Sequence, residues 1–219
     1  MKRPIPDPEF PGSGLLLSHL GVSLKVQQFF ADSFHSPSND ELCFSYGTVS
    51  ECFRFGFHYV PLVAKPWIAG NSNPSQISHV FLCNSAMEAV AFLALNYSSF
   101  SGMGKLLFIS FGVCPAQDQV DLVRERFRHK RIALIYGGDL LGRIADVKIA
   151  CWLNGKDLTV SHQMPGILKL RFQDTGYTFY EEKLTLSAFE RASGFRSDVR
   201  TYKPRHFMSF LEQLLSLML

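Results

Sequence analysis

The chain has 219 residues and a formal net charge of +3, with 47% hydrophobic and 19% charged residues. These values are typical of globular proteins, so they exclude a largely disordered chain, and the length suits one domain with additions or two small domains. The mildly basic charge permits a nucleic-acid partner without indicating one, because most surface Lys and Arg residues are simply solvated. We find no apolar run long enough to span a bilayer and no secretory signal peptide, so we expect a cytoplasmic protein with no membrane partner.

Three regions of different composition precede residue 79. Residues 1–14 are rich in Pro and Gly and predict an extended or disordered leader. Residues 15–75 predict an α+β region, with one or two short helices followed by a hairpin or small meander over residues 41–63. The Pro-, Gly-, Asn- and Ser-rich stretch at residues 64–78 is the best internal boundary.

Strands and helices alternate over residues 76–160. Short apolar runs predict strands at 79–83, 106–110 and 132–136, each followed by a helical pattern, and residues 157–164 are a candidate fourth strand. Apolar strands joined by crossover helices predict a parallel sheet with helices on both faces, which is a three-layer α/β fold.

Residues 161–219 predict a C-terminal extension packed on this core. A hairpin turning at "DTG" precedes helical patterns near residues 184–193 and 204–217. The last pattern has an apolar stripe, which predicts a helix docked on its own domain rather than one that binds a partner. The stripe consists of Phe207, Phe210, Leu211, Leu214 and Leu215.

The five cysteines include no Cys-x-x-Cys pair. Their odd number and their spacing indicate neither a zinc site nor a disulfide framework. Cys83, Cys114 and Cys151 lie in or beside apolar segments, so we expect them to pack as small buried hydrophobes.

Parallel sheets bind ligands beyond the carboxyl ends of their strands, which here selects residues 83–85, 112–114 and 137–139. Two segments contain the first and the third of these places. They are "HVFLCNSAMEAVAFLAL" and "IALIYGGDLLGRIADVKIA". In spacing they resemble the two motifs of the Toprim domain of primases, topoisomerases and related nucleases, especially the Toprim-like proteins of bacterial mobile elements. The resemblance covers about residues 78–160, and "KPRHFMSFLEQLL" loosely resembles a segment that often closes such domains. It implies a Toprim-like core in which the first and third strands are adjacent.

The motifs depart from the family pattern at the residues that catalysis would require. The family's glutamate, its proposed general acid/base, falls on Asn84, which cannot exchange a proton near neutral pH. The first aspartate of the second motif falls on Gly137. Glu88 and Asp139 remain as candidate metal ligands, and we expect them to hold Mg²⁺ weakly, because that ion needs clustered negative charge. The alternative is that Asp139 simply caps a helix.

The helix starts and the second motif also supply candidate phosphate contacts, because free N–H groups at a helix N-terminus favour anions. The candidates are Asn84, Ser85, Gly138, Gly142, Arg143 and Lys148.

The resemblance and its gaps predict a degenerate, non-catalytic or weakly active accessory protein of DNA replication, mobilisation or repair. We expect weak, salt-sensitive binding to nucleic acid, DNA rather than RNA, and a replication or mobilisation protein as a partner. One alternative is a Mg²⁺-dependent, primase-like nucleotidyl-transfer enzyme or nuclease that uses Glu88 and Asp139. Another is a protein-interaction module without affinity for nucleic acid.

Overall fold

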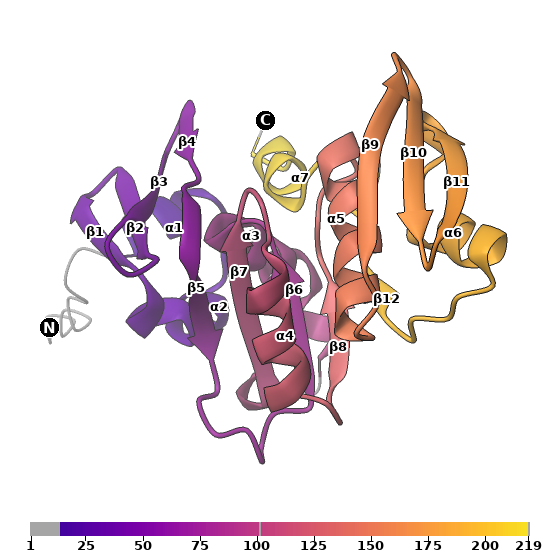
Figure 1. Cartoon of the computed structure of the whole chain (residues 1–219). Coiled ribbons are helices and arrows are strands. Elements are labelled where there is room, and N and C mark those ends of the chain that lie inside the picture. Colours follow the sequence, from indigo (N-terminus) through magenta and orange to yellow (C-terminus); the bar gives the residue numbers. More distant parts are fainter. Residues whose placement is uncertain (1–13, 101, 219) are drawn as a thin grey trace, which may run out of the picture.

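The computed structural model describes residues 14–100 and 102–218 (Figure 1). The leader predicted for residues 1–14 therefore lies, except for Gly14, outside the described residues. The described part is mixed α/β, with helices on both faces of a central sheet and an antiparallel sheet on either side of this core (Figure 1).

The central sheet is mixed, with strand order β12-β8-β6-β7-β5. β6 (His79–Cys83) lies between β7 (Leu106–Gly112) and β8 (Arg131–Leu134), and all three are parallel, which confirms the sequence prediction for these strands. β12 (Arg200–Thr201) adds a fourth parallel strand beside β8. β5 (Leu62–Gly70) is antiparallel to β7, so the sheet is not purely parallel.

Two features differ from the sequence expectation, although the candidate strand at residues 157–164 does form. The stretch at residues 64–78 begins inside β5, where Trp67 and Ala69 are buried in the core. The candidate fourth strand is β9 (Leu158–Met164), which pairs with β10 in a separate antiparallel sheet. β9 is exposed along most of its length, whereas a strand covered on both faces, such as β7, is buried at every residue.

The N-terminal region consists of short helices and a four-stranded antiparallel meander. The predicted meander is confirmed, although it begins before residue 41. Its elements are α1 (Leu15–His19), α2 (Leu24–Phe30), η1 (Ala31–Ser33), β1 (His35–Ser38), β2 (Glu41–Ser45), β3 (Ser50–Arg54) and β4 (Phe57–Tyr59).

The two faces of the central sheet are covered by different helices. α3 (Ala86–Asn96) packs on one face with α2 and α7 (Phe210–Ser216), and α4 (Gln117–Arg126) and α5 (Leu140–Leu153) pack on the other. Alternate residues of β6 enter the two cores, as a strand with two buried faces requires. Two single-turn helices, η2 (Tyr97–Ser99) and η3 (Met103–Lys105), link α3 to β7.

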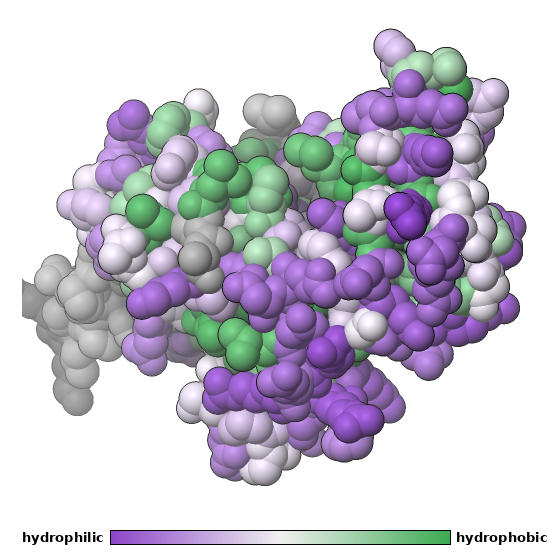
Figure 2. Space-filling model, viewed as in Figure 1, coloured by the Kyte–Doolittle hydropathy of each residue, from purple (hydrophilic) through white to green (hydrophobic). Residues whose placement is uncertain are grey.

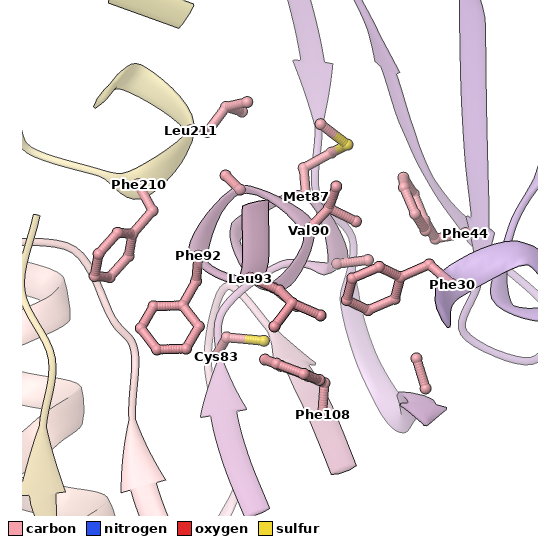
Figure 3. Packing of buried hydrophobic residues seen from close by; sticks show 14 of the residues in the cluster. Phe30, Phe44, Cys83, Met87, Val90, Phe92, Leu93, Phe108, Phe210 and Leu211 are labelled. Atoms are coloured by element: carbon pink, nitrogen blue, oxygen red, sulfur yellow. The ribbon is translucent and has the colours of Figure 1, made fainter. Parts of the chain in front are cut away.

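α3 is the centre of the larger core. Its residues 86–93 are all buried, and the ring of Phe92 lies between the sheet and the C-terminal helix (Figure 3). The Phe92 ring centroid is 5.2 Å from that of Phe81 in β6 and 5.1 Å from that of Phe210 in α7. The C-terminal helix is therefore docked on its own domain, as its apolar stripe predicts.

The C-terminal extension packs on α5. It contains β10 (Ile167–Phe172), β11 (Thr175–Tyr180), η4 (Glu181–Lys183) and α6 (Leu186–Ser193). The predicted hairpin is β10–β11, and it turns at Gln173 and Asp174, both with positive φ, one residue before the predicted "DTG".

Cys83 and Cys151 are buried as predicted, but Cys114 is exposed because it lies in the loop after β7. Among the described helices, none has the length and hydropathy that a membrane span requires.

Docking of α7 depends on a buried carboxylate of α3. Both oxygens of Glu88 accept bonds from the first N–H groups of α7, at 2.9 Å from Phe210 N and 3.0 Å from Leu211 N. Glu88 is 3% exposed, so water cannot replace it easily.

We expect Glu88→Ala to lower the free energy of unfolding by about 3 kcal/mol, because it leaves two buried N–H groups without an acceptor. Urea denaturation measures this change. Glu125→Ala, on the exposed side of α4, is the control and is expected to cost less than about 0.5 kcal/mol. Equal effects of the two substitutions would contradict the assignment.

Candidate functional site

The two predicted motif segments meet at one edge of the central sheet. β6 runs into Asn84 and Ser85, and its neighbour β8 runs toward Gly137, Gly138 and Asp139. Because the two strands are parallel and adjacent, both segments lie at their carboxyl ends, where parallel sheets bind ligands. We call this region the carboxyl edge.

A carboxylate of the protein itself occupies the N-terminus of α3. Glu51, in β3, is fully buried and accepts bonds from Ala86 N at 2.7 Å and Met87 N at 2.9 Å. Ser85 Oγ accepts a bond from the Glu88 N–H and caps the same helix. The phosphate position predicted at Ser85 is therefore filled by Glu51, which supplies the anion that a helix N-terminus favours.

Glu51 is also tied to the sheet through a tyrosine. Tyr46 Oη lies 2.7 Å from Glu51 Oε2 and 2.7 Å from Ser110 Oγ. Burial and the negative charge of Glu51 raise the pKa of Tyr46, so its phenol keeps its proton. Since a phenol has one proton, donation to Glu51 leaves Ser110 to donate to Tyr46. His58 Nε2 lies 2.9 Å from the other oxygen of Glu51, so this carboxylate is fully engaged.

The two predicted metal ligands act as caps of different helices. Glu88 bonds to α7, as described above, whereas Asp139 is the N-cap of α5 and accepts a bond from Gly142 N at 2.8 Å. The alternative interpretation of Asp139 as a helix cap is confirmed. Asn84, in the first segment, has its Oδ1 buried and without a partner in the described part of the chain.

The C-terminal segment covers the end of β8. Gly138 N donates to Met208 O at 2.7 Å, and a Cβ at Gly137 would lie 2.7 Å from the same oxygen. An aspartate side chain at position 137 would therefore collide with backbone. We call residues 203–209 the closing segment, because Met208 O within it lies where a side chain at position 137 would extend.

A cleft remains beside the closing segment, with a volume of about 310 Å³. It lies where α5, α6 and the end of β12 meet, and we call it the edge cleft. It includes two of the predicted phosphate contacts, Gly138 and Arg143. Its lining consists of Gly138, Arg143, Asp146, Thr185, Leu186, Ser187, Thr201 and Lys203.

Two cations and one carboxylate face this cleft. Lys203 Nζ lies 2.6 Å from Asp146 Oδ2 and donates to the carbonyls of Tyr136 and Gly137. The Arg143 guanidinium donates to the carbonyls of Gly138 and Glu181. Asp146 Oδ1 is buried and has no partner among the described residues.

Sequence reasoning missed Asp146 and Lys203. A signal for Asp146 existed, because it lies one helical turn after Arg143 and so shares its face of α5. Of the other predicted contacts, Lys148 lies outside the edge cleft, with its Nζ 4.8 Å from the Trp152 ring centroid. Gly142 is a packing position, because a Cβ there would lie 2.3 Å from Gly137 O.

Comparison of the chain with protein-family models, with curated proteins and with solved structures gives no match.

Asp146, in the edge cleft, makes the free energy of unfolding of the protein depend on pH. Burial raises the pKa of Asp146 from its ordinary value of 3.8 to about 6, although Lys203 lowers it. The folded protein therefore binds this proton more tightly than the unfolded chain, and the free energy of unfolding falls as pH rises from about 4 to about 6. The difference between the two pKa values corresponds to about 3 kcal/mol.

We expect Asp146→Asn to remove this pH dependence. Between about pH 4 and pH 7 the wild type should lose up to about 3 kcal/mol of stability relative to the variant, as measured by urea denaturation at several pH values. Asp157→Asn, at an exposed position after α5, is the control and should follow the wild type. A constant difference between wild type and Asp146→Asn would show that Asp146 titrates normally.

Proposed function

We propose that this chain is a non-catalytic, Toprim-like accessory protein of DNA replication, mobilisation or repair, which binds nucleic-acid phosphates weakly at the edge cleft. One observation carries the proposal: the carboxylates at the carboxyl edge hold the protein together instead of forming an open metal site. Glu51 and Glu88 bind helix N-termini, Asp139 caps α5, and Asp146 pairs with Lys203.

The order of the parallel strands supports the Toprim-like core. The first and third strands of the alternating region, β6 and β8, are adjacent, and the two motif segments follow them. The family resemblance implies this adjacency.

Charge and the space at the carboxyl edge support a protein without catalysis. Mg²⁺ binds through carboxylates together with waters and phosphate oxygens, and phosphoryl-transfer sites need a residue that moves a proton. Asn84 cannot move one, and Met208 O lies where a side chain at Gly137 would extend. Asp139 is exposed, but one of its carboxylate oxygens accepts the hydrogen bond that caps α5.

The edge cleft has the groups that bind phosphate. Lys203 and Arg143 supply positive charge, and three hydroxyl side chains supply further donors. With one carboxylate opposing two cations, the net charge is small, so few counterions are released on binding and affinity is low. The hydroxyl side chains are those of Thr185, Ser187 and Thr201.

We expect calorimetric titration with Mg²⁺ and Mn²⁺ to show no tight binding, and primer-synthesis and nuclease assays to show no metal-dependent turnover. Asp139→Ala should behave as the wild type in both. A double variant, Asn84→Glu with Gly137→Asp, restores the motif residues and should remain inactive, because Met208 O obstructs position 137. Robust turnover that disappears in Asp139→Ala would establish the enzyme alternative.

We expect the wild type to bind DNA with a dissociation constant of about 10⁻⁶ to 10⁻⁴ M near physiological salt, and more weakly as salt rises. Lys203→Ala should weaken binding to every sequence and reduce the slope of log affinity against log salt by about one. Fluorescence anisotropy measures both. Arg128→Ala is the matched control, because this exposed arginine precedes β8 and so lies near the opposite edge of the sheet.

Arg143→Ala should act as Lys203→Ala does, and circular dichroism would verify that each variant is folded. If both substitutions leave affinity and salt slope unchanged, the edge cleft does not bind DNA. Competition with single-stranded DNA, duplex DNA and RNA defines the preferred nucleic acid.

A second candidate, a protein-interaction module, is favoured by exposed apolar side chains near the meander. They belong to β4, the turn before it, the start of β5 and the loop after β7, a part of the surface where Figure 2 shows hydrophobic residues. β4 is also an edge strand, which a partner strand can extend. This candidate predicts no salt-dependent DNA binding. The side chains are Phe55, Phe57, Tyr59, Leu62 and Val113.

A further inference from the structure

The meander contains a cluster of metal-binding groups on its outer face. Glu41 and Cys43 lie in β2 and Cys52 lies in β3, and their ligand atoms are all within 4.8 Å of one another. The two cysteines are directly paired across the strands, and Glu41 precedes Cys43 by two residues, so the three side chains share one face. Glu51, next to Cys52, points to the opposite face and the core.

A fourth group lies in the same row. His35 of β1 is the partner of Cys43 across the other side of β2, so its imidazole is on the same face as the thiols. His35 is exposed, and Glu41 and Cys52 are half-buried, so an ion can reach the cluster from solvent.

We propose that this cluster, the hairpin thiol site, binds a zinc ion through Cys43, Cys52 and Glu41, with the exposed side chain of His35 turning in as the fourth ligand. Two thiolates, a carboxylate and an imidazole are ligands that tetrahedral Zn²⁺ takes in proteins. The thiols select against Mg²⁺ and Ca²⁺, which prefer oxygen. The site is separate from the edge cleft and does not depend on the function proposed there.

The separation of the sulfurs is close to the spacing that a zinc ion requires. Cys43 Sγ and Cys52 Sγ are 3.4 Å apart. Two sulfurs on a tetrahedral zinc, each about 2.3 Å from the metal, lie about 3.8 Å apart. A disulfide needs the sulfurs at about 2.05 Å, which is a larger change from the observed spacing.

Binding at this site would connect three strands of the meander. The ligands come from β1, β2 and β3, so the ion would fix the pairing of β2 with β3 from outside. β3 also carries Glu51 to the N-terminus of α3. The ion is therefore expected to stabilise the folded chain.

The test uses the full chain, reduced and kept free of oxygen, titrated with Co²⁺ as a spectroscopic substitute for Zn²⁺. We expect one equivalent to produce a thiolate-to-cobalt charge-transfer band, which Zn²⁺ then removes by displacing the cobalt. Zn²⁺ is also expected to raise the melting temperature of the wild type.

Cys52→Ser is the main variant, because this half-buried side chain tolerates the change better than buried Cys43. Loss of a residue that only orients a metal ligand already costs about 10- to 100-fold in affinity, so loss of a ligating thiolate should cost at least about 100-fold. Zn²⁺ should no longer raise the melting temperature of this variant. Cys114→Ser, at the exposed cysteine after β7, is the matched control and should bind as the wild type.

His35→Ala tests the contribution of the fourth ligand alone. It is expected to weaken metal binding by about tenfold or more without abolishing the charge-transfer band. The proposal is overturned if the reduced wild type gives no charge-transfer band, if Cys52→Ser retains wild-type affinity, or if the two thiols form a disulfide in air while the reduced protein binds no cobalt.

Discussion

Two buried carboxylates placed on helix N-termini hold the parts of this protein together. Glu51 joins the meander to α3, and Glu88 joins α3 to α7. A buried carboxylate is strongly destabilising unless several donors satisfy it, so each of these positions is stable only when both elements are in place. The N-terminal region, the central helix and the C-terminal helix are therefore expected to fold together, although their sequences are far apart.

The same contacts decide what the carboxyl edge can do. A metal site needs carboxylates that are free to face an ion. Here the carboxylates at the carboxyl edge accept hydrogen bonds from backbone N–H groups or pair with Lys203. Gly137 fits the closing segment, because Met208 O approaches so closely that a side chain at this position would collide with it. Glycine at position 137 thus allows the closing segment to approach the end of β8, and polar groups remain open in the edge cleft.

The sequence predicted the parts of the fold that local patterns determine. The apolar runs of β6, β7 and the end of β8 are unambiguous because both of their faces are buried. β12 has two residues and no such pattern, so it was missed. The cap at Asp139 follows from local chemistry and was foreseen as an alternative. The α3 N–H groups that donate to Glu51 lie 35 and 36 residues away, and nothing in its neighbourhood along the chain indicates them.

The cysteine cluster could not be predicted from local sequence patterns either. Spacing along the chain argued against a zinc site, yet the hairpin brings Cys43 opposite Cys52. Because side chains alternate along a strand, fixing Cys52 on the outer face also fixes Glu51 on the inner face, and a slip of one residue would turn Glu51 away from α3. An ion held by the hairpin thiol site would oppose that slip directly. The proposed zinc would then act on the carboxyl edge without touching it, through the register of β2 and β3.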